Sequence, residues 1–209
     1  MHSGNRLLVY DATSRPGQGL LRSSWATGAR IYRALGRIDG FYGAESWEDA
    51  LRWLSVAGAD RPISEVQFWG HGHWGEVLIG DERLNAASFD RGHRLRPLLD
   101  AFKKRLLDRG ASLVWLRTCE SFGADAGQAF AARLANELDA RVAGHTYVIG
   151  ALQSGLHGLR PGEVPRWRAT EGIAEGTASA PRRAHVSLPE APHTIHFMNG
   201  RFDPAWFDS

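Results

Sequence analysis

Apolar residues along the first 150 positions follow two different periods that alternate. Short apolar runs, each closed by a glycine or a polar residue, are typical of buried strands. Such runs cover residues 7–10, 63–69, 77–79, 111–116 and part of 141–150, with a weaker one at 38–42. These segments are the strands that we expect in the fold.

Between the runs, apolar residues recur at every third or fourth position, which is the spacing of one helix face. Stripes of this kind lie within 25–35, 47–54, 95–106 and 126–138. Ser46 and Asp49 form a capping box for the second helix, and Gly110 is expected to end the third. The alternation predicts an α/β fold, a three-layer sandwich with a mainly parallel central sheet.

The pattern changes after about residue 150, where six of the nine prolines lie. Residues 174–183 are small and polar, which predicts a flexible loop. Asn199-Gly200, between an apolar run and Arg201-Phe202, predicts a β-hairpin near 194–203. We expect one domain over 1–209, with a core at about 5–150 and a loop-rich C-terminal elaboration.

The charge balance and the single cysteine narrow the functional class. The chain has 25 Lys and Arg against 23 Asp and Glu, whereas a protein that coats nucleic acid has a clear basic excess. No apolar run approaches the roughly 18 residues of a membrane span, and the first residues lack the features of a signal peptide. Cys119 is the only cysteine, so no intramolecular disulfide forms. We expect a cytoplasmic protein that binds neither nucleic acid nor membrane, with its oligomeric state left open.

Two residues with reactive side chains follow predicted strands. His71 comes after the strand that ends at Trp69, and Cys119 after the one that ends at Leu116. Their separation, 119 − 71 = 48 residues, fits one crossover between neighbouring parallel strands, whose carboxyl ends meet at one sheet edge. A thiolate supported by an imidazole is a nucleophile, and the amides of Gly72 and Cys119 would stabilise an oxyanion. The alternative is a Cys119 that is only a small buried residue.

The same residues carry a resemblance to a known family. The block 66–80 resembles the strand and His-Gly segment of caspase-like cysteine peptidases, and 113–119 resembles their strand that ends in the nucleophilic cysteine. The chain is similar in particular to an uncharacterised caspase-like domain at the head of bacterial repeat-bearing surface proteins. The matching segments are His71-Gly-His-Trp-Gly75, Cys119, Gly127-Gln-Ala-Phe130 and Val142-Ala-Gly144. Thr118 departs from the glycine usual before that cysteine.

The resemblance implies a caspase-like fold and a cysteine endopeptidase that cleaves protein or peptide substrates through an acyl-enzyme. It implies Cys119 as nucleophile, His71 as base and Gly72 as an oxyanion donor. In such enzymes the residue two before the nucleophile lies at the floor of the P1 pocket. Here that residue is Arg117, which would favour an acidic P1 side chain. Alternatively, Arg117 pairs with Glu120 or Asp125, or reaches solvent. Glu120 would itself reverse the preference if it, and not Arg117, faced the pocket.

Three further residues near these strands are candidate substrate contacts: His73, Trp74 and His145. His73 and Trp74 belong to the His-Gly segment. His145 follows a strand expected beside that of Cys119, although a strand-end hydrogen bond is the plainer interpretation of it.

A zinc site is a weaker alternative use of the same histidines. It would combine His71 and His73 with His93 or Asp81, but no zinc spacing motif accompanies them. We therefore expect neither a metal nor a cofactor. Two other functions compete with the peptidase: a non-catalytic caspase-like module that binds a partner, and a cysteine-dependent hydrolase of small molecules. The absence of a Gly-x-Ser-x-Gly elbow argues against a serine α/β-hydrolase.

Overall fold

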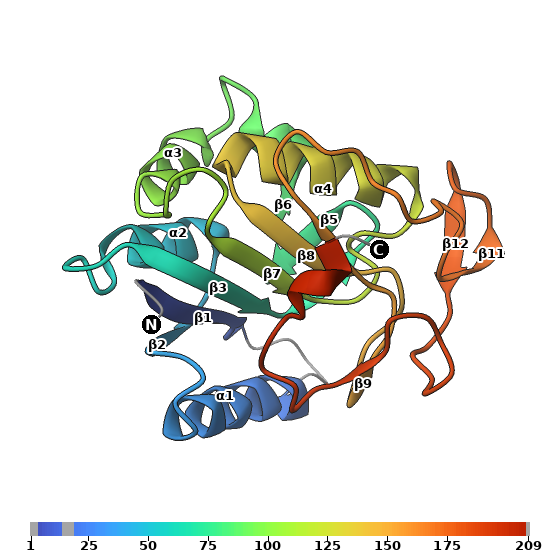
Figure 1. Cartoon of the computed structure of the whole chain (residues 1–209), viewed down its shortest axis with the longest axis horizontal. Coiled ribbons are helices and arrows are strands. Elements are labelled where there is room, and N and C mark those ends of the chain that lie inside the picture. Colours follow the sequence, from blue (N-terminus) through green and yellow to red (C-terminus); the bar gives the residue numbers. More distant parts are fainter. Residues whose placement is uncertain (1–3, 14–18, 208–209) are drawn as a thin grey trace.

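Six strands form the central sheet, in the order β10-β8-β7-β3-β1-β2 (Figure 1). The computed structural model describes residues 4–13 and 19–207. The strands of the sheet are β1 (Asn5–Asp11), β2 (Gly40–Ala44), β3 (Ile63–Trp69), β7 (Leu113–Arg117), β8 (Arg141–His145) and β10 (Leu156–Leu159). Only β10 runs antiparallel to its neighbour. The predicted α/β fold with a mainly parallel sheet is confirmed.

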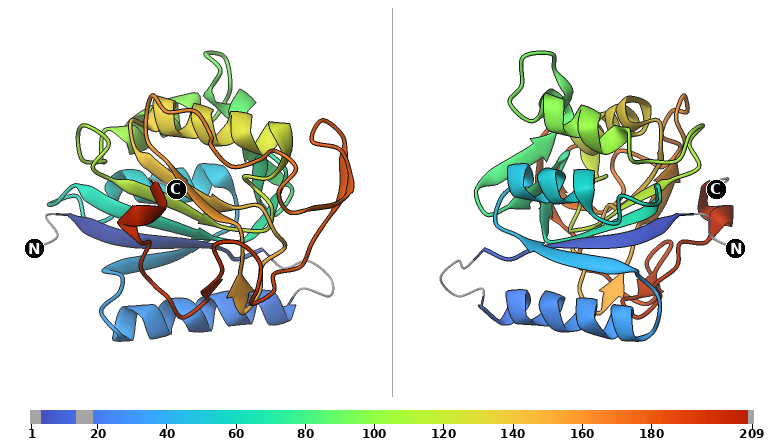
Figure 2. Two further views of the ribbon diagram at one scale, coloured as in Figure 1. Left: turned by 45° about the vertical axis from the view of Figure 1, so that its right-hand side comes forward. Right: turned by 90° about the vertical axis from the view of Figure 1, so that its left-hand side faces the viewer.

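Helices cover both faces of this sheet (Figures 1 and 2). The described part of the chain contains four α-helices: α1 (Gly19–Ala34), α2 (Trp47–Val56), α3 (Arg96–Lys103) and α4 (Ala124–Leu138). Because successive strand residues point to opposite faces, Leu7 and Val9 pack with α2, α3 and α4, whereas Leu8 packs with Tyr32 of α1. None of the described helices combines the length and the apolar character needed to cross a membrane.

Three small sheets complete the described structure. They are β4 (His71–His73) with β5 (Glu76–Ile79) and β6 (Glu82–Asn85), β11 (Ile173–Gly176) with β12 (Pro181–Ala184), and β9 (Leu152–Gln153) with β13 (Ile195–His196). Short 3-10 helices span Ala86–Phe89 and Pro204–Phe207. Strand β4 follows β3 after Gly70 and pairs antiparallel with β5.

The third helix is shorter than predicted. It ends at Lys103, and Gly110 lies beyond it in the turn before β7. The chain leaves the helix early because Arg105 and Leu106 extend beside the start of β3, where the Ile63 amide donates to the Arg105 carbonyl.

The hairpin predicted near 194–203 does not form. Ile195–His196 pairs with β9 instead, and residues 201–203 lie outside any strand. Phe202 and Phe207 are drawn into a cluster with Trp115 of β7, on the part of the sheet that α1 leaves uncovered. Burial of these two rings therefore outweighs the local turn preference of Asn199-Gly200.

A hairpin forms at a different place in the C-terminal elaboration. Residues 174–183, expected to be a flexible loop, contribute to β11 and β12, which project from the body of the molecule (Figures 1 and 2). Gly176 has a φ of +100°, a value that favours glycine, and Thr177 and Ala180 exchange backbone hydrogen bonds across the turn.

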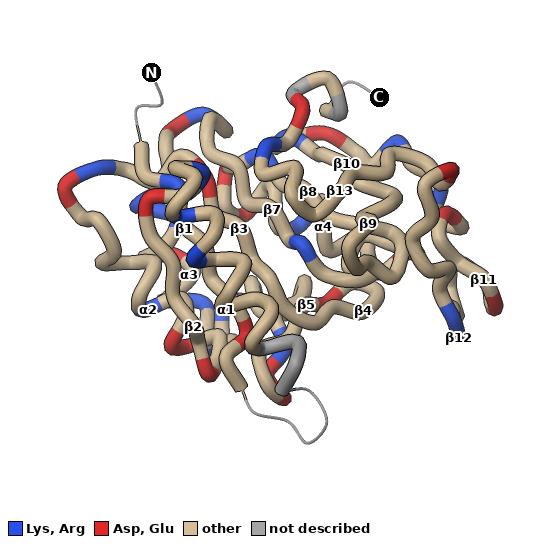
Figure 3. The backbone as a smooth tube through the Cα atoms, turned by 90° about the horizontal axis from the view of Figure 1, so that it is seen from below, with Lys and Arg blue, Asp and Glu red and all other residues tan. Residues whose placement is uncertain are grey.

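Basic and acidic residues are interspersed along the described backbone (Figure 3). The net charge of the chain is only +2.

Candidate active site

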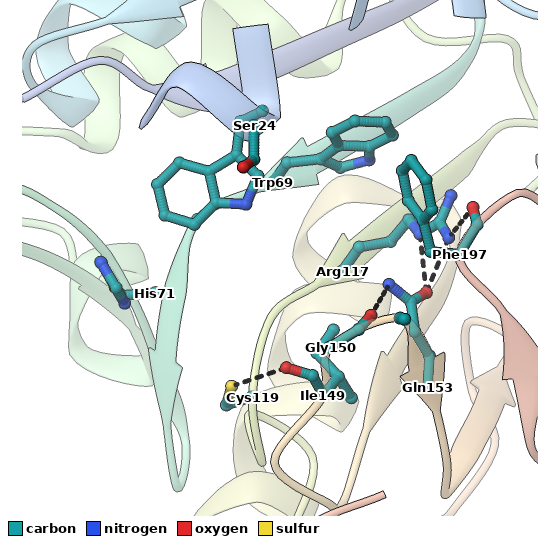
Figure 4. Close-up of a pocket in the computed structure, with 12 residues that line it drawn as sticks. Ser24, Trp69, His71, Arg117, Cys119, Ile149, Gly150, Gln153 and Phe197 are labelled. Carbon is teal, nitrogen blue, oxygen red and sulfur yellow. Dashed lines mark hydrogen bonds between the residues drawn. The ribbon is translucent and has the colours of Figure 1, made fainter. Parts of the chain in front are cut away.

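The carboxyl ends of β3 and β7, which are parallel neighbours, open onto one pocket of about 360 Å³ (Figure 4). His71 lies two residues beyond the end of β3, Cys119 lies two residues beyond the end of β7, and both line the pocket. The structure therefore brings together the two residues that strand order alone placed at one sheet edge. The other lining residues are Ser24, Trp25, Trp69, Gly70, Arg117, Ile149, Gly150, Ala151, Gln153 and Phe197.

The β4–β5 hairpin is held directly against the loop that carries the cysteine. A Cβ placed on Gly72 would lie 2.6 Å from the Cys119 carbonyl oxygen and 2.7 Å from the Thr118 Cβ. The Gly75 amide donates to the Ser121 carbonyl over 3.2 Å. Gly72, the predicted oxyanion donor, is not among the residues that line the pocket. Because it has no side chain, Gly72 allows β4 to pack closely against the cysteine loop.

The Cys119 side chain is partly buried, and its surroundings disfavour the thiolate. Burial raises the pKa of this thiol above its usual value, and the adjacent Glu120 carboxylate raises it further. The thiol donates to the Ile149 carbonyl, 3.8 Å from the sulfur. Figure 4 shows the sulfur turned toward Ile149, with His71 on the neighbouring strand. Helix α4 begins at Ala124, so its positive end lies a few residues beyond the cysteine.

Aromatic rings from α1 and from the C-terminal segment form the pocket walls. The Trp25 ring meets the His71 ring edge-on, with 5.2 Å between centroids. Phe197 lies against Trp69, 5.9 Å away. Neither Trp25 nor Phe197 is predictable as a site residue, because the sequence pattern around each aromatic residue is the same as that around an ordinary core residue.

Arg117 lies at the pocket and is 4% exposed. Its Nε and Nη2 donate to the Gln153 Oε1 over 3.0 and 2.7 Å, Nη1 donates to the Tyr32 hydroxyl over 2.7 Å, and Nη2 donates to the Phe197 carbonyl over 2.7 Å. Burial lowers the pKa of this guanidinium, which nonetheless stays protonated in proteins. Arg117 therefore neither pairs with Glu120 nor reaches solvent.

The charge of Arg117 has no carboxylate in direct contact with it among the described residues. Its Nη1 also approaches the Gln67 Oε1 at 3.4 Å, and the Gln67 amide in turn donates to Glu65 over 2.7 Å. Glu65 thus makes no hydrogen bond to the guanidinium, although its charge favours the protonated guanidinium, and burial raises the pKa of the Glu65 carboxyl group. The guanidinium also stacks over the Trp115 ring at 4.5 Å. The result is a buried cation, at one side of the pocket, whose hydrogen-bond acceptors are all neutral.

The predicted substrate contacts His73, Trp74 and Glu120 do not line the pocket. The His73 Nδ1 lies 2.7 Å from the Glu120 Oε1, and the His73 and Trp74 rings are 4.3 Å apart. The His73 side chain thus contacts both Glu120 and Trp74, outside the pocket that His71 and Cys119 line.

His145 does not line the pocket either. Its ring is fully buried, and its Nδ1 lies 3.1 Å from the Ser154 carbonyl. Burial lowers the pKa of His145 to about 3, so the ring is neutral at physiological pH. This residue is a strand-end hydrogen-bonding group, the plainer of the two interpretations.

No group of three or more His, Cys, Asp and Glu side chains suited to a metal occurs within residues 4–13 and 19–207. Of the histidines considered for zinc, His73 is bound to Glu120, and the His93 Nδ1 accepts a hydrogen bond from the Leu95 amide. The structure does not bring these histidines together as ligands.

Comparison with known proteins identifies a family but no characterised relative. No curated protein and no solved structure gives a significant match to this chain. One family model matches residues 43–158, more than half of the chain, and this stretch includes both His71 and Cys119. The chain belongs to the family described as Domain of unknown function (DUF4347).

Proposed function

We propose that this protein is a cysteine peptidase of caspase-like fold, with Cys119 as nucleophile and His71 as general base. The observation that supports this most directly is that the two residues line one pocket from the ends of adjacent parallel strands. Ligands of open parallel sheets bind beyond the carboxyl ends of the strands. A single free thiol is also consistent with a reducing compartment, and we propose the cytoplasm.

The proposed reaction begins when the thiol turns from the Ile149 carbonyl into the pocket. His71 takes the thiol proton, and the sulfur attacks the substrate carbonyl. The C–N bond then breaks, the imidazolium gives its proton to the leaving amine, and an acyl-enzyme remains. Water activated by His71 hydrolyses the thioester and returns the thiol. The amides of Gly72 and Cys119 are the proposed oxyanion donors.

Arg117 points to the class of side chain that the pocket accepts. Its guanidinium is buried, and its hydrogen bonds go to Gln153, Tyr32 and Phe197. A carboxylate entering the pocket would supply the charge that these neutral acceptors lack, whereas a Lys or Arg side chain would bring two like charges together. We propose protein or peptide substrates with an acidic residue at the cleavage site.

Active-site labelling tests the proposal. A chloroacetamide probe should label wild-type Cys119 faster than it labels an unperturbed thiol, and His71→Ala should remove this advantage. A peptide library then tests for cleavage and for acidic preference. Labelling that is no faster than that of a free thiol and independent of His71 would contradict the proposed dyad.

One observation favours a second candidate, a non-catalytic module that binds a partner through the same pocket. The thiol has a raised pKa and donates to Ile149, as expected of an inert buried cysteine.

The third candidate is a cysteine-dependent small-molecule hydrolase, since a pocket of about 360 Å³ is large enough for a small molecule. Rapid labelling without peptide cleavage would favour that hydrolase, and an unreactive thiol would favour the binding module.

A further inference from the structure

We propose that His73 is a positioning residue that acts on Cys119 through Glu120, by hydrogen bonding and holding in place the carboxylate next to the candidate nucleophile. The inference rests on the proposed function only in taking Cys119 as the reactive group. It gives a role to two residues that lie outside the pocket.

Glu120 occupies its position at a conformational cost. Its φ is +41°, in the left-handed region that glycine and asparagine adopt more readily than other residues. Its amide donates to the Tyr147 carbonyl over 2.9 Å, which fixes this backbone geometry. Glycine or asparagine would adopt this backbone conformation at a lower conformational cost. The presence of a glutamate at position 120 therefore indicates a role for its carboxylate.

The Glu120 carboxylate is nine-tenths buried, with its side chain 10% exposed. Its Oε1 is bound by the His73 Nδ1 at 2.7 Å. Its Oε2 is buried and makes no hydrogen bond within the described residues. His73 is thus the one side chain hydrogen-bonded to this carboxylate in the described structure.

His73 connects the two candidate catalytic segments through this hydrogen bond. It belongs to β4, two residues from His71. The contact therefore joins the strand of the candidate base to the loop of the candidate nucleophile.

Few charges compete with Glu120 near the thiol. The pocket residues from α1, from the loop after β8 and from the C-terminal segment are uncharged, and the charged or titratable lining groups besides Cys119 are Arg117 and His71. The Glu120 carboxylate adds to the effect of burial in raising the pKa of the Cys119 thiol. Loss of the His73 hydrogen bond would leave the carboxylate unscreened, and this would disfavour the thiolate further.

Alkylation of Cys119 by iodoacetamide as a function of pH reports its thiolate fraction in the full chain. Glu120→Gln keeps an acceptor for His73 and removes the charge, so the profile should move to lower pH. His73→Ala removes the hydrogen-bond donor and should move the profile to higher pH by roughly half a unit to one unit, which lowers the rate at neutral pH three- to tenfold. The double variant should match Glu120→Gln alone, because the carboxylate through which His73 acts is then absent.

Two alkylation results would overturn the inference. One is a His73→Ala shift that persists in the Glu120→Gln background. The other is unshifted profiles in both single variants, the result expected of a purely structural hydrogen bond. Peptidase activity is read separately. The predicted shifts without peptide cleavage would refute the proposed function and leave the role of His73 intact, whereas His71-dependent cleavage without the shifts would refute this inference alone.

Discussion

Gly72 and Cys119 are in such close backbone contact that residue 72 has no room for a side chain. A Cβ on Gly72 would lie 2.6 Å from the Cys119 carbonyl oxygen. The strand that carries His71 therefore reaches the cysteine loop only because a glycine follows the histidine. The pocket shared by His71 and Cys119 depends on this approach.

Gly72→Ala should displace the β4–β5 hairpin, because the atom in the way is a backbone oxygen that cannot rotate aside. We expect the free energy of unfolding to fall by about 1–3 kcal/mol, the usual cost of overpacking, and Cys119 alkylation to lose its dependence on His71. Chemical denaturation and labelling rates measure the two effects.

Gly92→Ala is the matched control for this substitution. No atom lies within 4 Å of a Cβ built on Gly92, so the variant should unfold and react like the wild type. Equal behaviour of Gly72→Ala and Gly92→Ala would show that the hairpin does not depend on the glycine contact.

Most of the central sheet is predictable from the sequence because strands such as β1, β3 and β7 are largely buried, whereas β10 (Leu156–Leu159) is not among the expected strands. Strand β7, for example, is apolar up to Arg117 and is preceded and followed by amphipathic helices. Strand β6 has no such signal, because its Glu82–Asn85 sequence is mostly polar. The predicted hairpin near 194–203 is wrong for a tertiary reason, since Phe202 and Phe207 gain more by packing on the sheet than by pairing locally.

The positions of Cys119 and His71 are predictable because each follows a strand, and parallel strands end at one edge. The rest of the pocket is not predictable in this way. Trp25, Gln153 and Phe197 reach it from α1, β9 and the C-terminal segment, which are far apart in the sequence. Only the packing of the third layer brings these segments to the sheet edge.

The stability of the fold should fall in mild acid through His145. The pKa of His145 is about 3 in the folded chain and about 6.5 in the unfolded chain. Between these two values the ring is protonated in the unfolded chain and neutral in the folded one, so lowering the pH favours unfolding. The loss begins near pH 6.5, grows as the pH falls toward 3, and reaches about 2 kcal/mol at pH 5.

Denaturation of wild type and His145→Gln at pH 7 and pH 5 isolates this contribution. The variant lacks the titrating ring, so its stability should depend less steeply on pH by about that amount, whatever its stability at pH 7. Identical pH dependence in the two proteins would show that His145 is not held neutral by burial.

Replacement of either candidate catalytic residue should remove activity and spare the fold. Cys119 is partly buried and makes one weak hydrogen bond, to Ile149, and His71 is partly exposed. Cys119→Ala and His71→Ala should therefore abolish peptide cleavage with nearly unchanged melting temperatures. Cleavage by Cys119→Ala at the wild-type level would point to another nucleophile, and a large loss of stability in both variants would indicate structural roles.

Arg117 should make the enzyme select acidic P1 residues. Fluorogenic peptides that differ only at P1 measure this preference as kcat/KM. We expect the wild type to favour Asp or Glu over neutral residues, and to cleave after Lys or Arg least. Arg117→Gln removes the buried positive charge and should lower kcat/KM for acidic peptides by roughly ten- to a hundredfold, the range of a charge-assisted interaction, with little change for neutral peptides.

Because Arg117 is buried and holds Gln153, Tyr32 and Phe197 together, its replacement also weakens the fold. Gln153→Glu separates the two effects, since the glutamate has the same shape, accepts the same guanidinium hydrogen bonds and satisfies the charge of Arg117 internally. This variant should stay folded and lose the acidic preference while Arg117 remains in place. Two results would exclude Arg117 as the residue that selects the P1 side chain. They are a wild-type preference for Lys or Arg at P1, and an acidic P1 preference that survives Gln153→Glu.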